Sequence, residues 1–168
     1  FNINNNTFRP KGPEGKFEWL STTNIDQVMD QYHSVYDDFN FLGAVPIDFD
    51  ELPSLGISNL NFNNLYKNGK HRLGIVFNLD EHWKSGSHWV SLFADLKKSQ
   101  IYYFDSYGKE PERRIKRLVN RIAKWIYKKH HCNKTKCSEA ETEEYMRKGK
   151  KNIIEKKLNI DYNQNRHQ

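Results

Sequence analysis

Apolar residues gather in short runs in the middle of the chain, and their spacing there is that of β-strands. The run Leu73–Leu79 is almost wholly apolar, as expected of a strand buried on both faces. The segments His88–Asp95 and Gln100–Phe104 form two further predicted strands, and the four residues between them match the length of a hairpin connection. The pattern therefore predicts three adjacent antiparallel strands.

Helical spacing appears on both sides of these strands. Apolar residues recur at helical intervals from about Asn24 to His33, and Thr23 with Asp26 fits a capping box at the start of that helix. Pro111 suits the first turn of a second helix that ends near Lys129. The second helix presents one apolar face, formed by Ile115, Leu118, Val119, Ile122, Trp125 and Ile126.

The remaining segments give weaker patterns. Residues 1–16 are rich in Asn and broken by Pro and Gly, so we expect an extended or mobile arm. Residues 39–49 are apolar but interrupted by one Gly and one Pro, which fits an irregular buried segment or an edge strand. Residues 54–70 predict a surface loop or one short helical turn, residues 132–151 a solvated helix or an insertion, and residues 157–161 a last strand.

The composition is that of one folded domain with polar appendages. A chain of 168 residues can bury a core without metals or disulfides, and the 14% of aromatic residues supply large anchors for it. No window approaches the roughly 18 consecutive apolar residues of a membrane span, and no secretory leader is visible. We therefore expect an intracellular protein without membrane contact, and the chain reads like a fragment of something longer.

The two cysteines, Cys132 and Cys137, lie in a Lys-rich segment and form no disulfide framework, which suits a reducing compartment. Together with His130 and His131 they offer four potential zinc ligands. Adjacent ligands at the end of a helix converge poorly on one metal ion. We therefore favour solvated residues at the end of a basic helix and expect no metal site.

The net charge of +6 is concentrated in one region of the chain. Residues 1–108 carry 9 Lys/Arg against 13 Asp/Glu, a net −4, whereas residues 109–157 carry 17 against 7, a net +10. Basic residues on one helix face can neutralise phosphates, but they also form the solvated side of a helix that packs on a sheet. We favour the solvated face and keep DNA or another polyanion as a secondary partner of residues 109–131.

His88 and Asp105 stand near the beginning and the end of the predicted hairpin. Because adjacent antiparallel strands return the chain to its starting edge, the two side chains could meet at one end of the sheet. A carboxylate on one ring nitrogen holds an imidazole in a single tautomer and leaves the other nitrogen to take a proton from a nucleophile. Spacing alone favours the alternative, in which His88 is an ordinary strand-edge residue and Asp105 begins a turn.

The residues around this pair form an ordered set of motifs: Trp19-Leu20, Gly86-Ser87-His88-Trp89, Tyr102-Tyr103-Phe104-Asp105-Ser106 and Arg166-His167-Gln168. The set resembles the ubiquitin-like-protein (SUMO) protease and adenain clan of cysteine peptidases, and within it most resembles the maturation proteases of large DNA viruses. In that clan a His-Trp on one strand is followed by an Asp-Ser or Asn-Ser at similar spacing, and a Gln shortly precedes an Asp/Glu-Cys-Gly segment.

The resemblance implies an α+β, papain-like cysteine protease fold with a mixed or antiparallel sheet flanked by helices. It gives His88 the role of general base and Asp105 that of its orienter. Gln168 matches the glutamine that donates to the developing oxyanion. Trp89 matches the aromatic residue that roofs a narrow channel around a Gly-Gly scissile segment, and Trp19 is a second substrate-binding residue. No metal or organic cofactor is implied.

The sequence departs from the clan in one respect, because it contains no Asp/Glu-Cys-Gly segment. Neither Cys132 nor Cys137 replaces it, since both precede the last predicted strand and neither is followed by Gly. We expect residues 17–168 to form a protease domain that stops before the nucleophile and is catalytically silent by itself.

The expected function is that of a thiol endopeptidase or isopeptidase that cleaves after Gly-Gly-like motifs. Its substrates are either a viral polyprotein or conjugates of a ubiquitin-like modifier. Two other classes stay open: a non-catalytic binder of a ubiquitin-like protein, and a basic nucleic-acid-binding protein.

Overall fold

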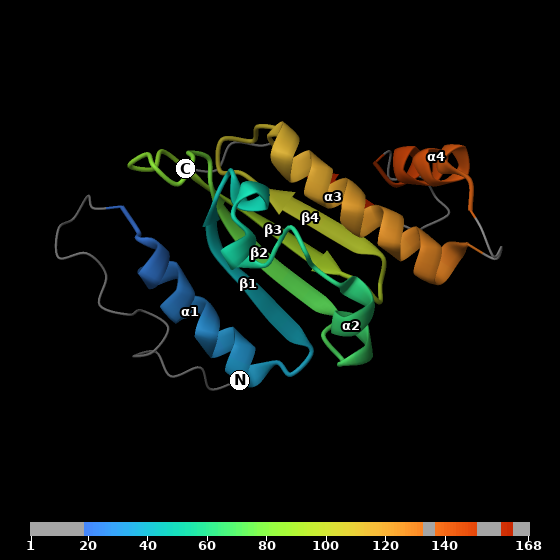
Figure 1. The fold of residues 1–168 in the computed structure, drawn as a ribbon, viewed down its shortest axis with the longest axis horizontal. Helices are drawn as coiled ribbons and strands as arrows, with labels where there is room; N and C mark the ends of the chain where they lie inside the picture. The colour runs from blue at the N-terminus through green and yellow to red at the C-terminus, as the bar shows by residue number, and fades with distance from the viewer. Residues whose placement is uncertain (1–18, 133–136, 151–158, 163–168) are drawn as a thin grey trace.

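A five-stranded mixed sheet in the order β1-β2-β3-β4-β5 forms the centre of the protein (Figure 1). The computed structural model describes residues 19–132, 137–150 and 159–162. The strands are β1 (Phe39–Pro46), β2 (Arg72–Asn78), β3 (Trp89–Asp95), β4 (Gln100–Phe104) and β5 (Asn159–Tyr162). The predicted antiparallel trio is confirmed as β2-β3-β4.

The two outer strands make the sheet mixed rather than purely antiparallel. β1 pairs in parallel with β2, and β5 pairs in parallel with β4. The prediction of an edge strand in residues 39–49 is confirmed by β1, whose register shifts between Phe41 and Ala44. The expected last strand is confirmed by β5. The arm expected in residues 1–16 lies outside the described residues.

Helices flank this sheet. In Figure 1, α1 (Thr22–Val35) lies along β1 and α3 (Arg113–Ile126) along the β4 side. A π-helical turn, η3 (Tyr127–His131), continues α3, and α4 (Glu139–Lys150) follows it. The connection between β1 and β2 contains three shorter elements, namely η1 (Phe49–Glu51), η2 (Pro53–Leu55) and α2 (Phe62–Lys67). No helix among the described residues combines the length and apolar character that crossing a membrane requires.

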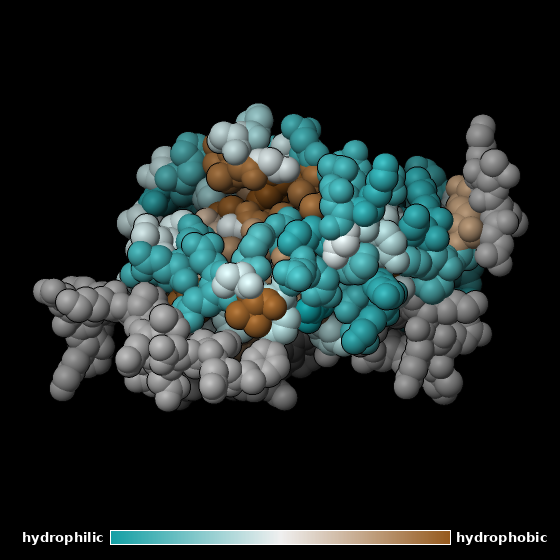
Figure 2. Space-filling model, turned by 90° about the horizontal axis from the view of Figure 1, so that it is seen from below, coloured by the Kyte–Doolittle hydropathy of each residue, from teal (hydrophilic) through white to brown (hydrophobic). Residues whose placement is uncertain are grey.

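The core lies between α3 and the sheet. Six apolar side chains of α3 are buried: Ile115, Leu118, Val119, Ile122, Ala123 and Ile126. Five of them were predicted from the helical spacing. Ala123 was not, and Trp125, which was predicted on the same face, is only partly buried. The six buried side chains pack in one cluster with strand residues such as Phe77, Leu92 and Ile101. Burying each large aliphatic or aromatic side chain stabilises the fold by about 1.5–3 kcal/mol. This packing fixes the ends of β3 and β4 relative to α3. On the face seen in Figure 2, an apolar hollow is surrounded mostly by hydrophilic residues.

The start of α1 differs from the prediction by two residues. The N-cap is Ser21, whose hydroxyl oxygen accepts from the Asn24 backbone N–H at 3.2 Å, while the Asn24 side chain accepts from the Ser21 N–H at 2.9 Å. The expected box of Thr23 and Asp26 is therefore wrong. Asp26 instead accepts a hydrogen bond from the Ala44 backbone N–H and ties α1 to β1.

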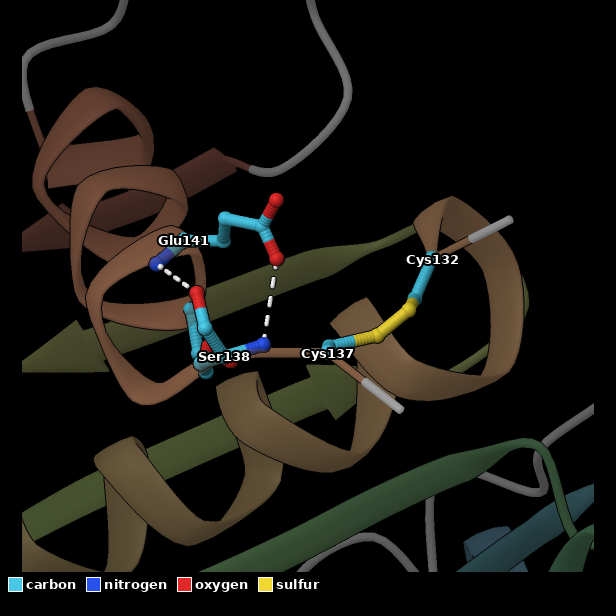
Figure 3. The surroundings of a disulfide bond; sticks show 5 residues. Cys132, Cys137, Ser138 and Glu141 are labelled. Atoms are coloured by element: carbon cyan, nitrogen blue, oxygen red, sulfur yellow. Dashed lines mark hydrogen bonds between the residues drawn. A yellow bond between two sulfur atoms is a disulfide. The ribbon is translucent and has the colours of Figure 1, made fainter. Parts of the chain in front are cut away.

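The segment after α3 also differs from the prediction. Cys132 and Cys137 are joined in a disulfide, beside a capping box formed by Ser138 and Glu141 at the start of α4 (Figure 3). The expectation that the His and Cys residues here are solvated is wrong. His130 donates to the Leu96 carbonyl at 2.8 Å, and His131 lies 3.0 Å from the Ser99 hydroxyl, so both rings pack against the β3–β4 turn.

Candidate active site

His88 and Asp105 lie together at one end of the β3–β4 hairpin. Ser91 pairs with Phe104, the last residue of β4, so His88 and Asp105 both lie beyond this pair at the same end of the hairpin. His88 Nε2 is 2.6 Å from Asp105 Oδ1. The carboxylate is buried, with 1% of its side chain exposed, and the imidazole is 15% exposed. The contact expected from the hairpin is therefore present, with one ring edge left accessible.

A turn after β4 holds the imidazole from two sides. Asp105 Oδ1 also accepts from the Tyr107 backbone N–H at 2.9 Å, and the Gly108 N–H donates to the Asp105 carbonyl at 2.8 Å. The Tyr107 ring stacks on His88, with 4.5 Å between ring centroids and 26° between planes. The Asp-Ser-Tyr-Gly turn was visible in the sequence, but this contact of Tyr107 was not predicted.

The geometry assigns different roles to the two imidazole nitrogens. Nε2 is the nitrogen bonded to Asp105, and an ionised carboxylate can only accept, so Nε2 carries the proton. The other ring nitrogen, Nδ1 of His88, has no hydrogen-bond partner among the described residues. Nδ1 is therefore the atom that can exchange a proton with a neighbouring group.

The loop before β3 is closed by Asn78. Its Oδ1 atom accepts the backbone N–H of Asp80 at 3.0 Å and that of Ser87 at 3.2 Å. Gly86 has φ +92° and lies so close to the Asn78 side chain that a Cβ atom there would collide with the amide. Gly86 belongs to the motifs recognised in the sequence, whereas the role of Asn78 was not predicted. Together they set the direction in which the chain enters His88 and Trp89.

A second His–Asp pair anchors the outer part of this loop. His82 Nδ1 is 2.5 Å from Asp48 Oδ2, and the His82 backbone N–H donates to Asp48 Oδ1 at 3.0 Å. Burial raises the pKa of the Asp48 carboxyl, but the hydrogen bonds from the His82 side chain and backbone outweigh it and hold that pKa below its ordinary value of 3.8. This pair ties the loop to η1 and was not predicted.

Glu81 links the same loop to α3. Its carboxylate lies 2.6 Å from Lys84 Nζ and 3.2 Å from Arg114 of α3. The hydrogen bonds from Lys84, from the backbone and from Arg114 lower the pKa of Glu81 from 4.5 to about 2. A lowered pKa stabilises the folded state above the ordinary pKa, and this contribution is lost as the pH falls from about 4.5 toward 2.

We therefore expect Glu81→Gln to lower the melting temperature at neutral pH and to have a vanishing effect near pH 2. Melting curves of the wild type and of Glu81→Gln from pH 7 to pH 2 measure the difference in melting temperature. Glu139→Gln, which changes an exposed residue at the start of α4, serves as the control. A difference between wild type and Glu81→Gln that stays constant down to pH 2 contradicts the assignment.

A pocket of about 380 Å³ lies beside Trp89. Trp19, Trp89, Val45 and Pro46 give it an apolar side. Residues of the loop before β3 give it a polar side, namely Asp80, Glu81, His82, Lys84, Ser85 and Gly86. The Trp89 indole N–H donates to the Leu20 carbonyl at 3.0 Å, which joins the start of β3 to the segment before α1. The structure thus brings the two predicted tryptophans to one pocket, although Trp19 is 65% exposed.

The other predicted chemistry lies elsewhere. Gln168 is outside the described residues. Cys132 follows His131, which contacts Ser99 in the β3–β4 turn, and that turn is at the opposite end of the hairpin from His88. A seven-residue strand is about 20 Å long, so the disulfide is far from the imidazole. Both cysteines are paired, and in the described part of the chain no His/Cys/Asp/Glu group is arranged to hold a metal ion.

The mixed sheet, the flanking helices and the His–Asp pair at the strand ends define the class of the protein as an α+β cysteine protease fold. The model of the Ulp1 protease family, C-terminal catalytic domain, matches residues 75–161, which is just over half of the chain. The chain therefore belongs to the Ulp1 protease family, and the resemblance inferred from its motifs is confirmed.

Its relatives include viral proteases. A protein of Acanthamoeba polyphaga mimivirus named as a thiol protease is 39% identical over 123 residues, covering 73% of this chain and 41% of the relative. The SUMO-1 cysteine protease of African swine fever virus is 27% identical over 143 residues, covering 76% of this chain and 52% of the relative. The chain thus spans about half the length of these relatives, or less.

The fold is similar to a solved viral protease. The crystal structure of the African swine fever virus protease matches with a TM-score of 0.59 and 27% identity, covering 71% of this chain and 48% of that one. The predicted α+β cysteine protease fold is confirmed by this similarity.

Proposed function

We propose that this chain supplies the general base, its orienter and one substrate pocket of a cysteine protease that cleaves after Gly-Gly-like sites. The observation that carries the proposal is the 2.6 Å contact between a partly accessible His88 and a buried Asp105, next to Trp89. In this proposal residues 17–168 are a protease domain, and the thiol that His88 serves lies outside these 168 residues. The disulfide pairing of Cys132 and Cys137 supports the last point.

The proposed mechanism uses the free nitrogen of His88. Nδ1 takes the proton of the thiol, the thiolate attacks the scissile carbonyl, and the imidazolium then gives its proton to the leaving amine. Asp105 accepts from Nε2–H throughout, so the ring stays in one tautomer and its positive charge is stabilised. Gln168 is assigned the donor to the developing oxyanion, a contact worth a few kcal/mol in other proteases.

Specificity is assigned to the Trp89 pocket. An indole held by a hydrogen bond to the Leu20 carbonyl is a rigid wall, and a substrate segment passing beside it must have small side chains. Gly-Gly fits this requirement. Both a viral polyprotein and a conjugated ubiquitin-like modifier can present such a segment, and the African swine fever virus relative is named as a SUMO-1 protease.

The function is tested with a peptide that ends in Gly-Gly joined to a fluorogenic amine. We expect no turnover by the 168 residues alone, and turnover by a protein that contains these residues together with the proposed thiol. Iodoacetamide should abolish that turnover, because it alkylates the nucleophilic thiol. Turnover that resists alkylation would refute a thiol mechanism. A longer protein that binds a ubiquitin-like protein without cleaving its tail would instead be a non-catalytic binder.

We expect Trp89→Ala in the active protein to raise KM for the Gly-Gly peptide at least about tenfold, because the pocket loses its fixed aromatic wall. The preference for Gly-Gly over Ala-Ala at the cleavage site should fall with it. Steady-state kinetics on the two peptides measure both effects.

Trp83→Ala is the matched control, since Trp83 is on the same loop, is 65% exposed and does not line the pocket. Unchanged KM and selectivity in Trp89→Ala would remove this residue from the substrate site.

A further inference from the structure

The outer face of α3 and η3 is formed only by cations. Among residues 113–131, every exposed side chain is a Lys or Arg, namely Arg113, Arg117, Lys124, Lys128 and Lys129. The same stretch contains eight Lys or Arg residues and no Asp or Glu. Six apolar residues of the helix are buried and Trp125 is partly buried, so no exposed apolar residue interrupts this face.

The exposed cations differ from the others on the helix in having no carboxylate partner among the described residues. Three half-buried cations are neutralised within the fold, in the pairs Arg114–Glu81, Lys116–Glu110 and Arg121–Asp50. No ion pair involves the five exposed cations in the part of the chain that the structure describes, and Lys129 lies over the Tyr66 ring. The positive charge of the face is therefore available to a ligand.

Four of these cations form a straight line, here named the basic row: Arg113, Arg117, Lys124 and Lys128. At 100° per residue they fall within about 60° of the helix circumference, and they extend over roughly 20 Å. Like charges four residues apart, as in Arg113/Arg117 and Lys124/Lys128, destabilise a helix. A helix face that contacts only water could carry Glu or Asp at some of these positions. The row contains only cations, which indicates an anionic ligand that offsets the repulsion between them.

We propose that the basic row binds the phosphate backbone of a nucleic acid. A row of evenly exposed cations without apolar neighbours matches a polymer that presents one negative charge per nucleotide. A membrane-binding helix needs an exposed apolar face, and a protein interface needs an apolar centre. The described surface of α3 provides neither. The binding does not depend on catalysis, so it goes beyond the proposed protease function.

The test is fluorescence anisotropy of a labelled 20-base-pair DNA duplex with the full chain at several salt concentrations. The slope of log Kd against log salt reports the number of phosphates contacted. We expect Arg117→Gln/Lys124→Gln to weaken binding and to reduce the slope by roughly 1.8, at about 0.9 for each lost contact. Arg117→Lys/Lys124→Arg keeps both charges and should keep both the affinity and the slope.

Two controls separate the basic row from general charge. Lys97→Gln/Lys98→Gln removes two exposed cations from the β3–β4 turn and should leave the slope nearly unchanged. Equal losses of DNA affinity and of salt slope in this variant and in Arg117→Gln/Lys124→Gln would overturn the proposal. DNA binding that does not depend on salt would also overturn it. Polyglutamate or phosphatidylserine vesicles that bind as tightly as DNA at equal charge would also overturn it, in favour of an acidic protein or a membrane surface.

Discussion

Replacement of His88 by Ala in the catalytically active protein is expected to lower kcat/KM for a Gly-Gly peptide by at least about three orders of magnitude. The reason is that the proposed mechanism uses His88 Nδ1 as the only base, while the Asp105 carboxylate at the same end of the hairpin is bonded to His88 Nε2 and to the Tyr107 N–H. The His82–Asp48 pair has similar chemistry, but its ring is committed to anchoring the loop through Nδ1. Steady-state cleavage of the fluorogenic peptide measures the loss.

The His88→Ala variant also leaves the buried Asp105 carboxylate without its ring partner, which costs about 1–3 kcal/mol of stability. His88→Gln separates this effect from catalysis, because the Gln amide can donate to Asp105 but cannot take a proton from a thiol. We expect the melting temperature of His88→Gln to be closer to that of the wild type than the melting temperature of His88→Ala is. His88→Gln should still lose activity. His33→Ala, on the exposed side of α1, should retain full activity. Substantial turnover by His88→Gln would remove His88 as the base.

One local rule predicted that His88 and Asp105 lie at the same end of the hairpin, whereas their pairing was expected from the resemblance of the motifs, because spacing alone favoured an ordinary strand edge and a turn. Two strands joined by a short turn bring their outer ends together, and the strand limits were visible as apolar runs in the sequence. Tyr107 and Asn78 could not be predicted in the same way. Their contacts depend on turn and loop conformations, in which Asp105 accepts the Tyr107 N–H and Asn78 accepts two backbone N–H groups.

The parallel pairing of β1 and β5 shows a second limit of the sequence. Each outer strand could be recognised as a strand, but its direction depends on how a long connection returns to the sheet. The start of α1 shows a third. Ser21 with Asn24 and Thr23 with Asp26 both offer a side-chain acceptor three residues before a partner, and the pairing of Asp26 with the Ala44 N–H removes the second option.

The Cys132–Cys137 disulfide was missed because its spacing resembled no disulfide framework, and the neighbouring histidines suggested a polar helix end. In the structure these histidines pack on the Leu96 carbonyl and the Ser99 hydroxyl. The β3–β4 turn and the end of η3 therefore meet at the end of the hairpin remote from the site. Such a contact joins residues more than thirty positions apart, which no local periodicity reports.

The second large effect concerns Asp105, which the proposed mechanism makes a positioning residue because it touches the imidazole and is not expected to touch the substrate. We expect Asp105→Ala to lower kcat by about 10²–10⁴, with a much smaller change in KM. Without the carboxylate, the imidazole can rotate or adopt the other tautomer, and Nδ1 no longer faces the thiol as a base. The Tyr107 N–H also loses its acceptor, so the turn that stacks Tyr107 on His88 loosens.

Asp105→Asn provides the informative comparison, because its carbonyl oxygen can still accept from His88 Nε2–H and from the Tyr107 N–H. If Asp105 acts mainly by orienting the ring, Asp105→Asn should retain at least about tenfold more kcat than Asp105→Ala, with a melting temperature closer to that of the wild type. Asp30→Asn, on the exposed side of α1, controls for the loss of one negative charge. Equal losses of kcat in Asp105→Asn and Asp105→Ala would mean that the negative charge, rather than the orientation of the imidazole, is what the reaction requires from Asp105.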